Sequence, residues 1–323
     1  MTIRRVLARA LALLAVAVAG TAAAQGYPNK AIRVIVPYPP GGGTDVIARI
    51  LQEPLAAELG QPIIIDNRGG AAGNLGTDLA AKATADGYTI LFTLSSHTIN
   101  PKLYDKLPFD VERDFAPITL ATLVPQILVA NPSLPANNMK ELIALARKKP
   151  GSLSYGSAGI GASGHLAGEL LNSAEGIDIV HVPYKGGAPA LADLVAGRIQ
   201  VMFLSISLSA PQVKQGRIKV LALTGKAHSE KLPGVTTTAE QGFPDVQALL
   251  FSSLLAPAGT PDAIIRRMNA EVVKALKTPE VEKRLDDLGA VPSPTSPEQF
   301  AAILKRDGEV WGKLIRDKNI RAD

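Results

Sequence analysis

The chain has 323 residues, of which 46% are hydrophobic and 4% aromatic, and it contains no cysteine. This length suffices for about two domains with a buried core each, and the lack of cysteine excludes both disulfide bonds and a lipid-modified N-terminal cysteine. Three of the 34 basic residues and no acidic residue fall within 1–24, so the remainder holds 31 basic and 29 acidic residues. The charge excess is therefore small, and since no stretch interleaves Lys or Arg with aromatic residues, we expect no nucleic-acid partner.

The first 24 residues have the pattern of a secretory signal peptide. Arg4-Arg5 precedes an apolar stretch at 6–20, and Ala22-Ala23-Ala24 offers a small-residue cleavage site. This pattern fits both general secretion and the twin-arginine route. No later segment reaches about 18 uninterrupted apolar residues, the minimum for a membrane-spanning helix. We therefore expect a periplasmic protein that is cleaved near Ala24.

From residue 31, strand and helix patterns alternate. Apolar, β-branched runs predict buried parallel strands at 31–38, 62–67 and 88–94. Amphipathic patterns between them predict helices at 45–59 and 74–83. Thr44 stands where a helix N-cap is expected, and Pro54 is expected to kink or shorten the first helix.

The second half repeats this order. Strand patterns occur at 153–157, 177–184, 199–205 and 219–225, and helix patterns occur at 164–173 and 189–197. Two successive β-α-β-α-β sets predict two lobes, each built on a parallel sheet.

Two long β-rich segments, 117–133 and 246–259, connect these sets, and three amphipathic helices follow at 261–276, 279–288 and 297–315. We interpret the two segments as crossings between the lobes, with the C-terminal helices returning to the first lobe. The prediction is an α/β protein with a cleft between two hinged lobes. The expected boundaries are 25–122 with 252–323 for lobe 1, and 123–251 for lobe 2.

A glycine-rich turn follows the first strand of each set. These turns are the first glycine loop (Tyr38–Asp45) and the second glycine loop (Ser157–Ser163). Ligands of parallel α/β sheets bind at the C-terminal ends of strands, where glycine permits close approach and a helix N-terminus offers free N–H groups. Neither loop contains a basic residue, so backbone amides with Thr44, Ser157 and Ser163 would hold an anion. A small carboxylate fits such a cleft better than phosphate.

Other chemistries have weaker support in the sequence. Gly159-Ile-Gly161-Ala-Ser-Gly164 matches the dinucleotide-binding spacing, but the next strand ends in Tyr184-Lys185 and lacks the acidic residue that binds ribose. The four histidines, at 97, 165, 181 and 228, show no metal-binding spacing. No G-x-S-x-G elbow occurs, so a periplasmic hydrolase of small acid esters or amides remains only as the alternative.

Several candidate residues have two interpretations. Asp45 could bind a ligand amine or simply be stabilised by the helix dipole. His97 and His165 could each donate to a ligand or satisfy nearby backbone, whereas His181 is expected to be structural and His228 solvated. Tyr38, Tyr184 and Phe203 could contact a ligand or pack. The segment 67–76 could form a third cleft loop or a plain tight turn, and Trp311 is expected in a core.

In combination, these loops resemble the Bug receptors, the periplasmic substrate-binding proteins of tripartite tricarboxylate transporters. The resemblance runs from about Tyr27 to the C-terminus and rests on "VPYPPGGGTDVIAR", "DNRGGAAGNLG", "SSHTINPKLY", "YGSAGIGASGHLAGE", "VPYKGGAPALADLVAGRIQVMF" and "LAPAGTP". It implies a two-lobed periplasmic binding protein of type II (Venus-flytrap) architecture. It also implies that a ligand carboxylate is held between the two glycine loops, largely through backbone groups and bridging waters.

The sequence thus predicts a non-enzymatic, monomeric receptor without cofactor or metal. Its expected ligand is a dicarboxylate, an acidic amino acid or an aromatic acid. Its expected partners are membrane permease subunits or a sensor kinase. The expected ligand-contacting residues are Tyr38, Pro40, Gly41, Gly42, Gly43, Thr44, Asp45, Gly73, Ser95, His97, Ser157, Ala158, Gly159, Gly161, Ala162, Ser163, Tyr184, Phe203 and Ser205.

Overall fold

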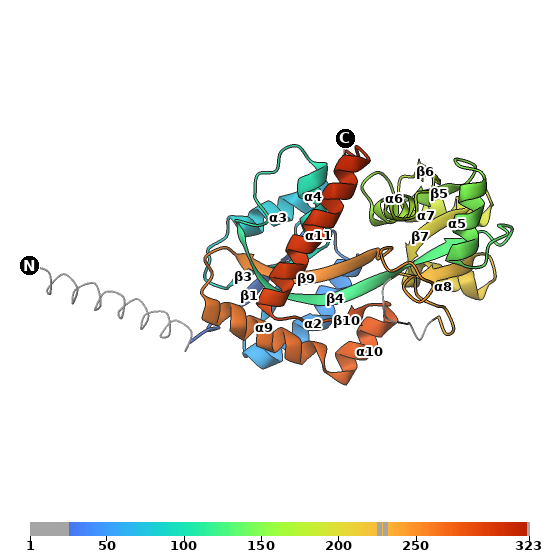
Figure 1. Ribbon diagram of the computed structural model, residues 1–323. Coiled ribbons are helices and arrows are strands. Elements are labelled where there is room, and N and C mark those ends of the chain that lie inside the picture. Colours follow the sequence, from blue (N-terminus) through green and yellow to red (C-terminus); the bar gives the residue numbers. More distant parts are fainter. Residues whose placement is uncertain (1–25, 225–227, 229–231, 322–323) are drawn as a thin grey trace, which may run out of the picture.

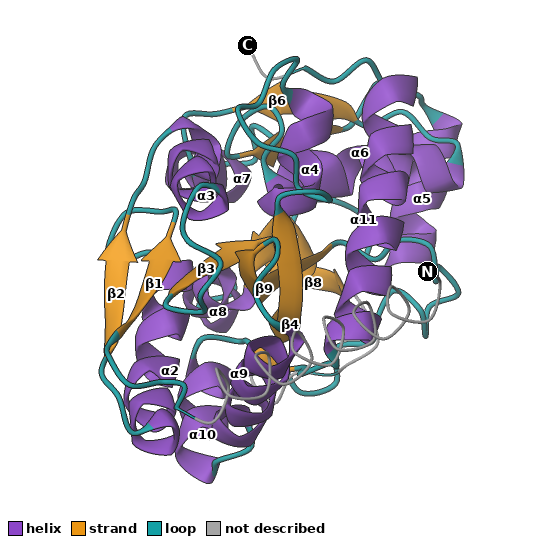
Figure 2. Cartoon of the chain, turned by 90° about the vertical axis from the view of Figure 1, so that its left-hand side faces the viewer, coloured by secondary structure: helices purple, strands orange, loops and turns teal. Residues whose placement is uncertain are grey.

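A parallel three-stranded unit lies at the centre of each lobe in the computed structural model, which describes residues 26–224, 228 and 232–321. In lobe 1, β1 (Ile32–Val36) lies between β2 (Ile63–Asn67) and β3 (Thr89–Leu94) (Figure 2). In lobe 2, β5 (Ser154–Ser157) lies between β6 (Val180–Pro183) and β7 (Val201–Ser205). Both units therefore have the strand order 2-1-3, and in both the first strand is central. The two predicted parallel sets are confirmed.

Two long strands connect the lobes. β4 (Phe115–Ala130) and β9 (Leu249–Pro257) pair antiparallel, and β9 also pairs with β3. The C-terminal end of β4 pairs with β7 and with β8 (Lys219–Leu223). The short β10 (Val291–Pro292) pairs with Thr122 and Leu123 in the middle of β4. Figure 1 shows β4 extending from one lobe into the other. The predicted crossing segments are thus strands, and they join the two sheets edge to edge.

Helices cover both faces of the lobe 1 sheet. Residues of α2 (Gly43–Leu59), α9 (Asp262–Leu276) and α10 (Pro279–Asp287) share one apolar cluster with β1. On the other face lie α3 (Asn74–Ala81) and α11 (Pro297–Asp317), which share a cluster containing Leu91 and Phe300. The short helix η1 (Ala71–Gly73) precedes α3, and α4 (Ser96–Leu103) follows β3. The C-terminal helices therefore return to lobe 1, as predicted.

Lobe 2 has the same layered build. One face of its sheet packs against α5 (Met139–Lys148) and α6 (Ser163–Glu175), around Tyr155 and Phe203. The opposite face packs against α7 (Gly187–Val195) and α8 (Ile206–Lys214). Each lobe consequently has a core on both sides of its strands.

The lobes also contact each other through helices. Leu166 of α6 is fully buried in a cluster with Ile99 and Leu103 of α4 and with Trp311 of α11, which is 5% exposed. Figure 1 shows α11 beside α4, with α6 next to its C-terminal part. Trp311 is therefore in a core, as expected, but that core is shared between the lobes.

One local prediction is wrong, and another is answered in part. Thr44 does not cap α2, because the helix begins one residue before it and Gly42 is the N-cap, without a capping side chain. Pro54 does not shorten α2, which continues to Leu59.

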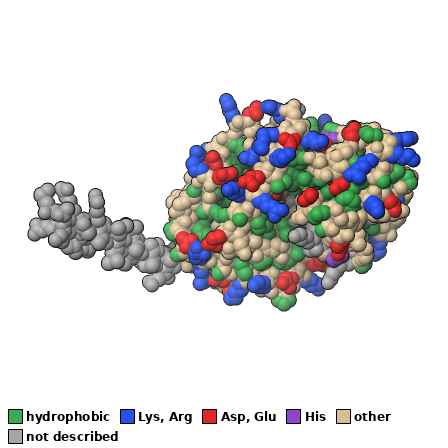
Figure 3. All heavy atoms as spheres, in the orientation of Figure 1, with side chains coloured by type: hydrophobic (Ala, Val, Ile, Leu, Met, Phe, Trp, Pro, Cys, Tyr) green, Lys and Arg blue, Asp and Glu red, His purple; other side chains and the backbone are tan. Residues whose placement is uncertain are grey.

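The predicted signal peptide falls outside the described residues. Of the helices within them, none is both long and apolar enough to cross a membrane. On the face in Figure 3, basic and acidic side chains are interspersed.

Candidate ligand-binding site

The first glycine loop leaves the central strand β1 and enters α2 with an exposed backbone. Pro40, Gly41, Gly42 and Gly43 are all exposed. The first backbone hydrogen bond of α2 runs from the Val46 N–H to the Gly42 carbonyl, over 3.0 Å. Helix geometry therefore leaves the N–H groups of residues 43–45 without intrahelical acceptors. These donors carry the positive end of the helix dipole and can bind an anion.

Asp45 holds this loop in shape. Its side chain is only 2% exposed and accepts hydrogen bonds from the Gly41 N–H (2.8 Å), Asn67 Nδ2 (3.0 Å) and Arg49 Nε (3.0 Å). Burial alone would raise the pKa of Asp45, but the hydrogen bonds from Arg49, Gly41 and Asn67 lower it below its usual range. Both carboxylate oxygens are therefore engaged, which favours the structural interpretation of Asp45 over binding a ligand amine.

Tyr38 lies beneath the same loop. Its hydroxyl hydrogen-bonds Ser96 Oγ and lies 3.5 Å from Thr93 Oγ1. At Gly73, which has a φ of +92°, a Cβ would come within 3.2 Å of the Tyr38 ring. The segment 67–76 thus packs against the first glycine loop, with Gly73 allowing close contact with Tyr38.

The second glycine loop leaves the central strand β5 and enters α6 after Ala162, again without a capping side chain. Ala158 is exposed, whereas Ser157 is fully buried. The Ser157 hydroxyl donates to the Gly159 carbonyl over 2.9 Å, and His181 Nε2 lies 2.7 Å from Ser157 Oγ. These contacts support the loop from below.

A stacked pair of histidines supports the same loop. His165 Nδ1 accepts the Gly161 N–H over 3.0 Å, and the rings of His165 and His181 stack with centroids 3.9 Å apart at 17°. Burial and the neighbouring His165 lower the pKa of His181 to about 4, and burial lowers the pKa of His165 as well. Both rings are therefore neutral at pH 7, which His165 must be to accept from Gly161. His165 satisfies nearby backbone, the second of its two interpretations.

Ser157 and His181 have the spacing of a nucleophile and a base. However, Ser157 is 0% exposed, so a substrate has no route to its hydroxyl. Its hydrogen bonds to Gly159 are instead those of a residue that fixes the loop. The pair gives no support to the hydrolase alternative.

A small cavity lies where the two lobes meet. Ser95 of lobe 1, Gln126 of β4 and Ser163 of α6 line it together with Trp311, and apolar side chains complete its wall. Gln126 Nε2 donates to Ser163 Oγ over 2.8 Å. The Ser95 hydroxyl and Gln126 Oε1 are buried without a hydrogen-bond partner among the described residues. The cavity has a volume of only about 10 Å³, which is too small for a carboxylate in this arrangement of the lobes. Because buried polar atoms are normally paired, these two become candidate ligand contacts if the lobes move apart there.

The structure brings Ser95 and Ser163 together as predicted site residues, but separates others from them. Phe203 is 3% exposed and packs in the lobe 2 core. Tyr184 donates its hydroxyl to Asp193 Oδ2 over 2.8 Å, and Ser205 is the N-cap residue of α8. His97 lines a different cavity, within lobe 1. Gln126 was not predicted; its one signal is an amide side chain in a crossing strand whose other polar residues are Thr119 and Thr122.

The chain is similar to known proteins over both lobes. Residues 47–320 match the model of the tripartite tricarboxylate transporter family receptor. A UPF0065 protein from the tcbD–tcbE intergenic region of Pseudomonas sp. (strain P51) is 38% identical over 92% of this chain and 89% of its own. Protein BugT of Bordetella pertussis (strain Tohama I) is 35% identical over 94% of each chain.

Solved structures show the same similarity. Rpa4515 of R. palustris, with adipate, has a TM-score of 0.75 at 33% identity and covers 91% of this chain and 99% of its own. MatC of Rhodopseudomonas palustris, with bound malate, has a TM-score of 0.71 at 31% identity and covers 90% of this chain and all of its own. The two-lobed architecture is thus that of solved periplasmic binding proteins.

Proposed function

Because the chain belongs to the family of tripartite tricarboxylate transporter receptors, we propose that it is a receptor that captures a small carboxylate in the cleft between its lobes. One observation carries this proposal. Two uncapped helix N-termini, those of α2 and α6, follow glycine turns on the equivalent central strands of both lobes, the first turn exposed and the second partly exposed. Carboxylates in the structures of two relatives support the same ligand class.

The two glycine loops would bind the carboxylate through backbone donors. Neither loop has a Lys or Arg, so the negative charge would be balanced by N–H groups and helix dipoles. Ser95 and Gln126 would accept or donate at the base of the cleft, where their side chains have unpaired polar atoms. Binding would favour the closed arrangement, because only there do both loops reach the ligand.

The remaining features of the proposal follow from this role. The chain would act without catalysis or cofactor, as a monomer, and would hand its ligand to permease subunits or a sensor kinase. It would reach the periplasm through the signal peptide, cleaved near Ala24. Lobe 2 would comprise 123–251, and lobe 1 would comprise 25–122 with 252–323.

The lone tryptophan offers a direct test, because Trp311 lines the cavity with Ser95, Gln126 and Ser163. Adipate, malate, glutamate and aromatic acids should be titrated while fluorescence is followed, with calorimetry in parallel. We expect one carboxylate class to change the emission saturably. Trp311→Phe should lose the fluorescence signal but keep the binding measured by calorimetry.

Gln126→Leu should weaken binding about 5-fold or more, since it removes a buried hydrogen-bonding group. Silence from every acid in both measurements would contradict the proposal.

A further inference from the structure

A second cavity lies inside lobe 1, away from the glycine loops. Its volume is about 200 Å³, and residues of α4, β4 and α11 enclose it. The walls are mainly apolar, with Phe115 and Pro117 on one side and Ala301 and Leu304 of α11 on another. A space of this size and lining suits an apolar group as large as an aromatic ring.

His97 is the polar group of this cavity. Its side chain is 4% exposed, and neither ring nitrogen has a hydrogen-bond partner among the described residues. The ring packs edge-on against Phe115, with centroids 5.0 Å apart at 83°. Burial lowers the pKa of His97 to about 4, although the Val111 carbonyl acts in the opposite direction. His97 is therefore neutral. Its donor faces the Val111 carbonyl without a well-formed hydrogen bond, and its acceptor has no partner among the described residues, which is costly for a buried group.

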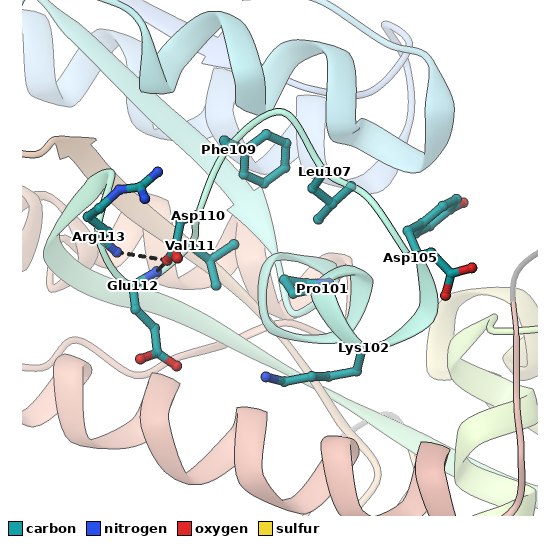
Figure 4. Close-up of a pocket in the computed structure, with 10 residues that line it drawn as sticks. Pro101, Lys102, Asp105, Leu107, Phe109, Asp110, Val111, Glu112 and Arg113 are labelled. Atoms are coloured by element: carbon teal, nitrogen blue, oxygen red, sulfur yellow. Dashed lines mark hydrogen bonds between the residues drawn. The ribbon is translucent and has the colours of Figure 1, made fainter.

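The opening of the cavity is polar. Lys102, Val111 and Glu112 line both this cavity and a larger surface hollow of about 590 Å³ under the loop 104–113. In Figure 4 the side chains of Lys102 and Glu112 extend on the side that faces α11. Lys305 lines the cavity from α11 itself. Within the described parts of the chain, Lys102, Glu112 and Lys305 form no ion pair. The opening therefore carries two positive charges and one negative charge.

We propose that this cavity is a second binding site, separate from the cleft, for a small amphipathic carboxylic acid. The apolar body of the ligand lies against Phe115 and Leu304, and its carboxylate faces Lys102 and Lys305. A hydroxyl at the far end of the ligand pairs with His97. A ring that carries a carboxylate at one end and a hydroxyl at the other satisfies all three requirements, so 4-hydroxyphenylacetate is the chosen probe.

The four histidines separate this site from the cleft in one experiment. His97 reports on the cavity, His165 and His181 report on the second glycine loop, and His228 is paired with Glu240 on the surface. The mature protein, labelled with ¹⁵N-histidine, is titrated with 4-hydroxyphenylacetate and observed by long-range ¹H–¹⁵N spectra. We expect a saturable shift of the His97 ring nitrogens that persists when the cleft is disabled by Gly42→Val. Phenylacetate, which lacks the hydroxyl, should bind about 5-fold more weakly, the worth of one hydrogen bond.

Two neighbouring alanines of α11 supply matched variants. Both alanines are exposed, but only Ala301 lines the cavity, and Ala302 does not. Ala301→Phe should weaken the His97 response at least about 10-fold, while Ala302→Phe should leave it unchanged. Lys102→Ala with Lys305→Ala should weaken it and reduce its salt dependence. The proposal is overturned if the His97 signals do not shift saturably, if only His165 and His181 respond, or if Ala301→Phe has no effect.

Discussion

Gly42 and Gly161 lie within the two glycine loops for different physical reasons. Gly161 has a φ of +74°, and a Cβ there would lie 2.9 Å from Leu103 Cδ1, so the fold itself favours glycine. Gly42 has a φ of −74°, and its only neighbour within 4 Å would be the Pro39 carbonyl at 3.5 Å. The fold therefore leaves space for a side chain at Gly42, and glycine at this position is consistent with the proposed close approach of a ligand.

Gly42→Val consequently separates binding from stability. We expect the variant to lose at least about 10-fold in carboxylate affinity, because the side chain blocks the N–H groups at the start of α2. Its melting temperature should stay near that of the wild type. Gly26→Val, at a position with open space away from both proposed sites, is the control and should bind normally. Wild-type affinity of Gly42→Val in calorimetry would show that the first glycine loop does not contact the ligand.

Asp307 has a largely buried carboxyl group beside the contact between the lobes. Its carboxylate accepts from Trp311 Nε1 over 2.9 Å and from the Thr98 hydroxyl. Burial raises its pKa to about 6, although both hydrogen bonds act to lower it. The folded state therefore binds this proton more tightly than the unfolded state. The resulting contribution is favourable below pH 4 and is lost as pH rises through 6.

Asp307→Asn should remove this loss, because an amide keeps the acceptor for Trp311 and can donate to Thr98. We expect the variant to be more stable than the wild type at pH 8 by about 1–3 kcal/mol. The difference should shrink toward zero near pH 4. Urea unfolding of both proteins at the two pH values measures it. A less stable variant at pH 8 would mean that the ionised carboxylate stabilises the fold.

Residue-level predictions from sequence succeeded where the local chain determines the outcome. The glycine turns and the exposed His228 are examples, since their neighbours in sequence are also their neighbours in space. The environments of Gln126 and His97 depend on α6 and α11, which are far away in the chain. No local pattern could show that Gln126 reaches Ser163 or that His97 lacks a partner.

Strands and helices with a regular hydrophobic pattern in the sequence were predicted well. Helices without such a pattern were not predicted. The β-branched runs of β1 and β3 and the amphipathic pattern of α9 identified them directly. By contrast, α4 and α8 contain Pro101 and Pro211 and many polar residues, so neither shows a clear helical period. They follow β3 and β7 directly, and α4 supplies His97 to its cavity.

The histidine pair makes the second glycine loop sensitive to acid. Because the folded pKa of His181 is about 4, below the ordinary 6.5, its contribution to stability is complete above pH 6.5. It is lost as pH falls toward 4. Protonated His165 could not accept the Gly161 N–H either, so carboxylate affinity should fall over the same range. We expect affinity and stability to be flat from pH 7 to 8.5.

The variant His181→Gln tests whether the histidine pair causes this pH dependence. His181→Gln keeps a partner for Ser157 but does not titrate, so it should reduce the slope of stability against pH between 4 and 6.5. The control is the exposed His228→Gln, which removes the hydrogen bond to Glu240 but leaves the histidine pair intact, so it should change the slope less than His181→Gln does. Chemical denaturation and calorimetry at five pH values would measure both properties. An unchanged slope in His181→Gln would exclude the histidine pair as its origin.

At the scale of the whole molecule, the crossing strands and the α6–α11 contact lie close together. Gln126 on β4 and Leu250 on β9 line the same small cavity as Trp311. Movement of the lobes is therefore expected to bend β4 and β9 there while α6 stays against α11. Saturating carboxylate should reduce the radius of gyration in X-ray scattering. Gly42→Val at the same ligand concentration should show no change. Equal dimensions of the wild type with and without bound ligand would contradict a closing cleft.

The apolar core of lobe 2 comes from one continuous segment of the chain, whereas that of lobe 1 comes from two. Both lobe 2 clusters use residues between 127 and 248 only, whereas the cluster around α2 joins residues 32–121 to residues 254–290. A chain delivered from its N-terminus would thus complete lobe 2 while lobe 1 still lacked β9 and α9. During this interval the edge of β3 that later pairs with β9 has no partner strand and is exposed to aggregation. Loss of the last 70 or so residues would accordingly abolish lobe 1 and spare lobe 2.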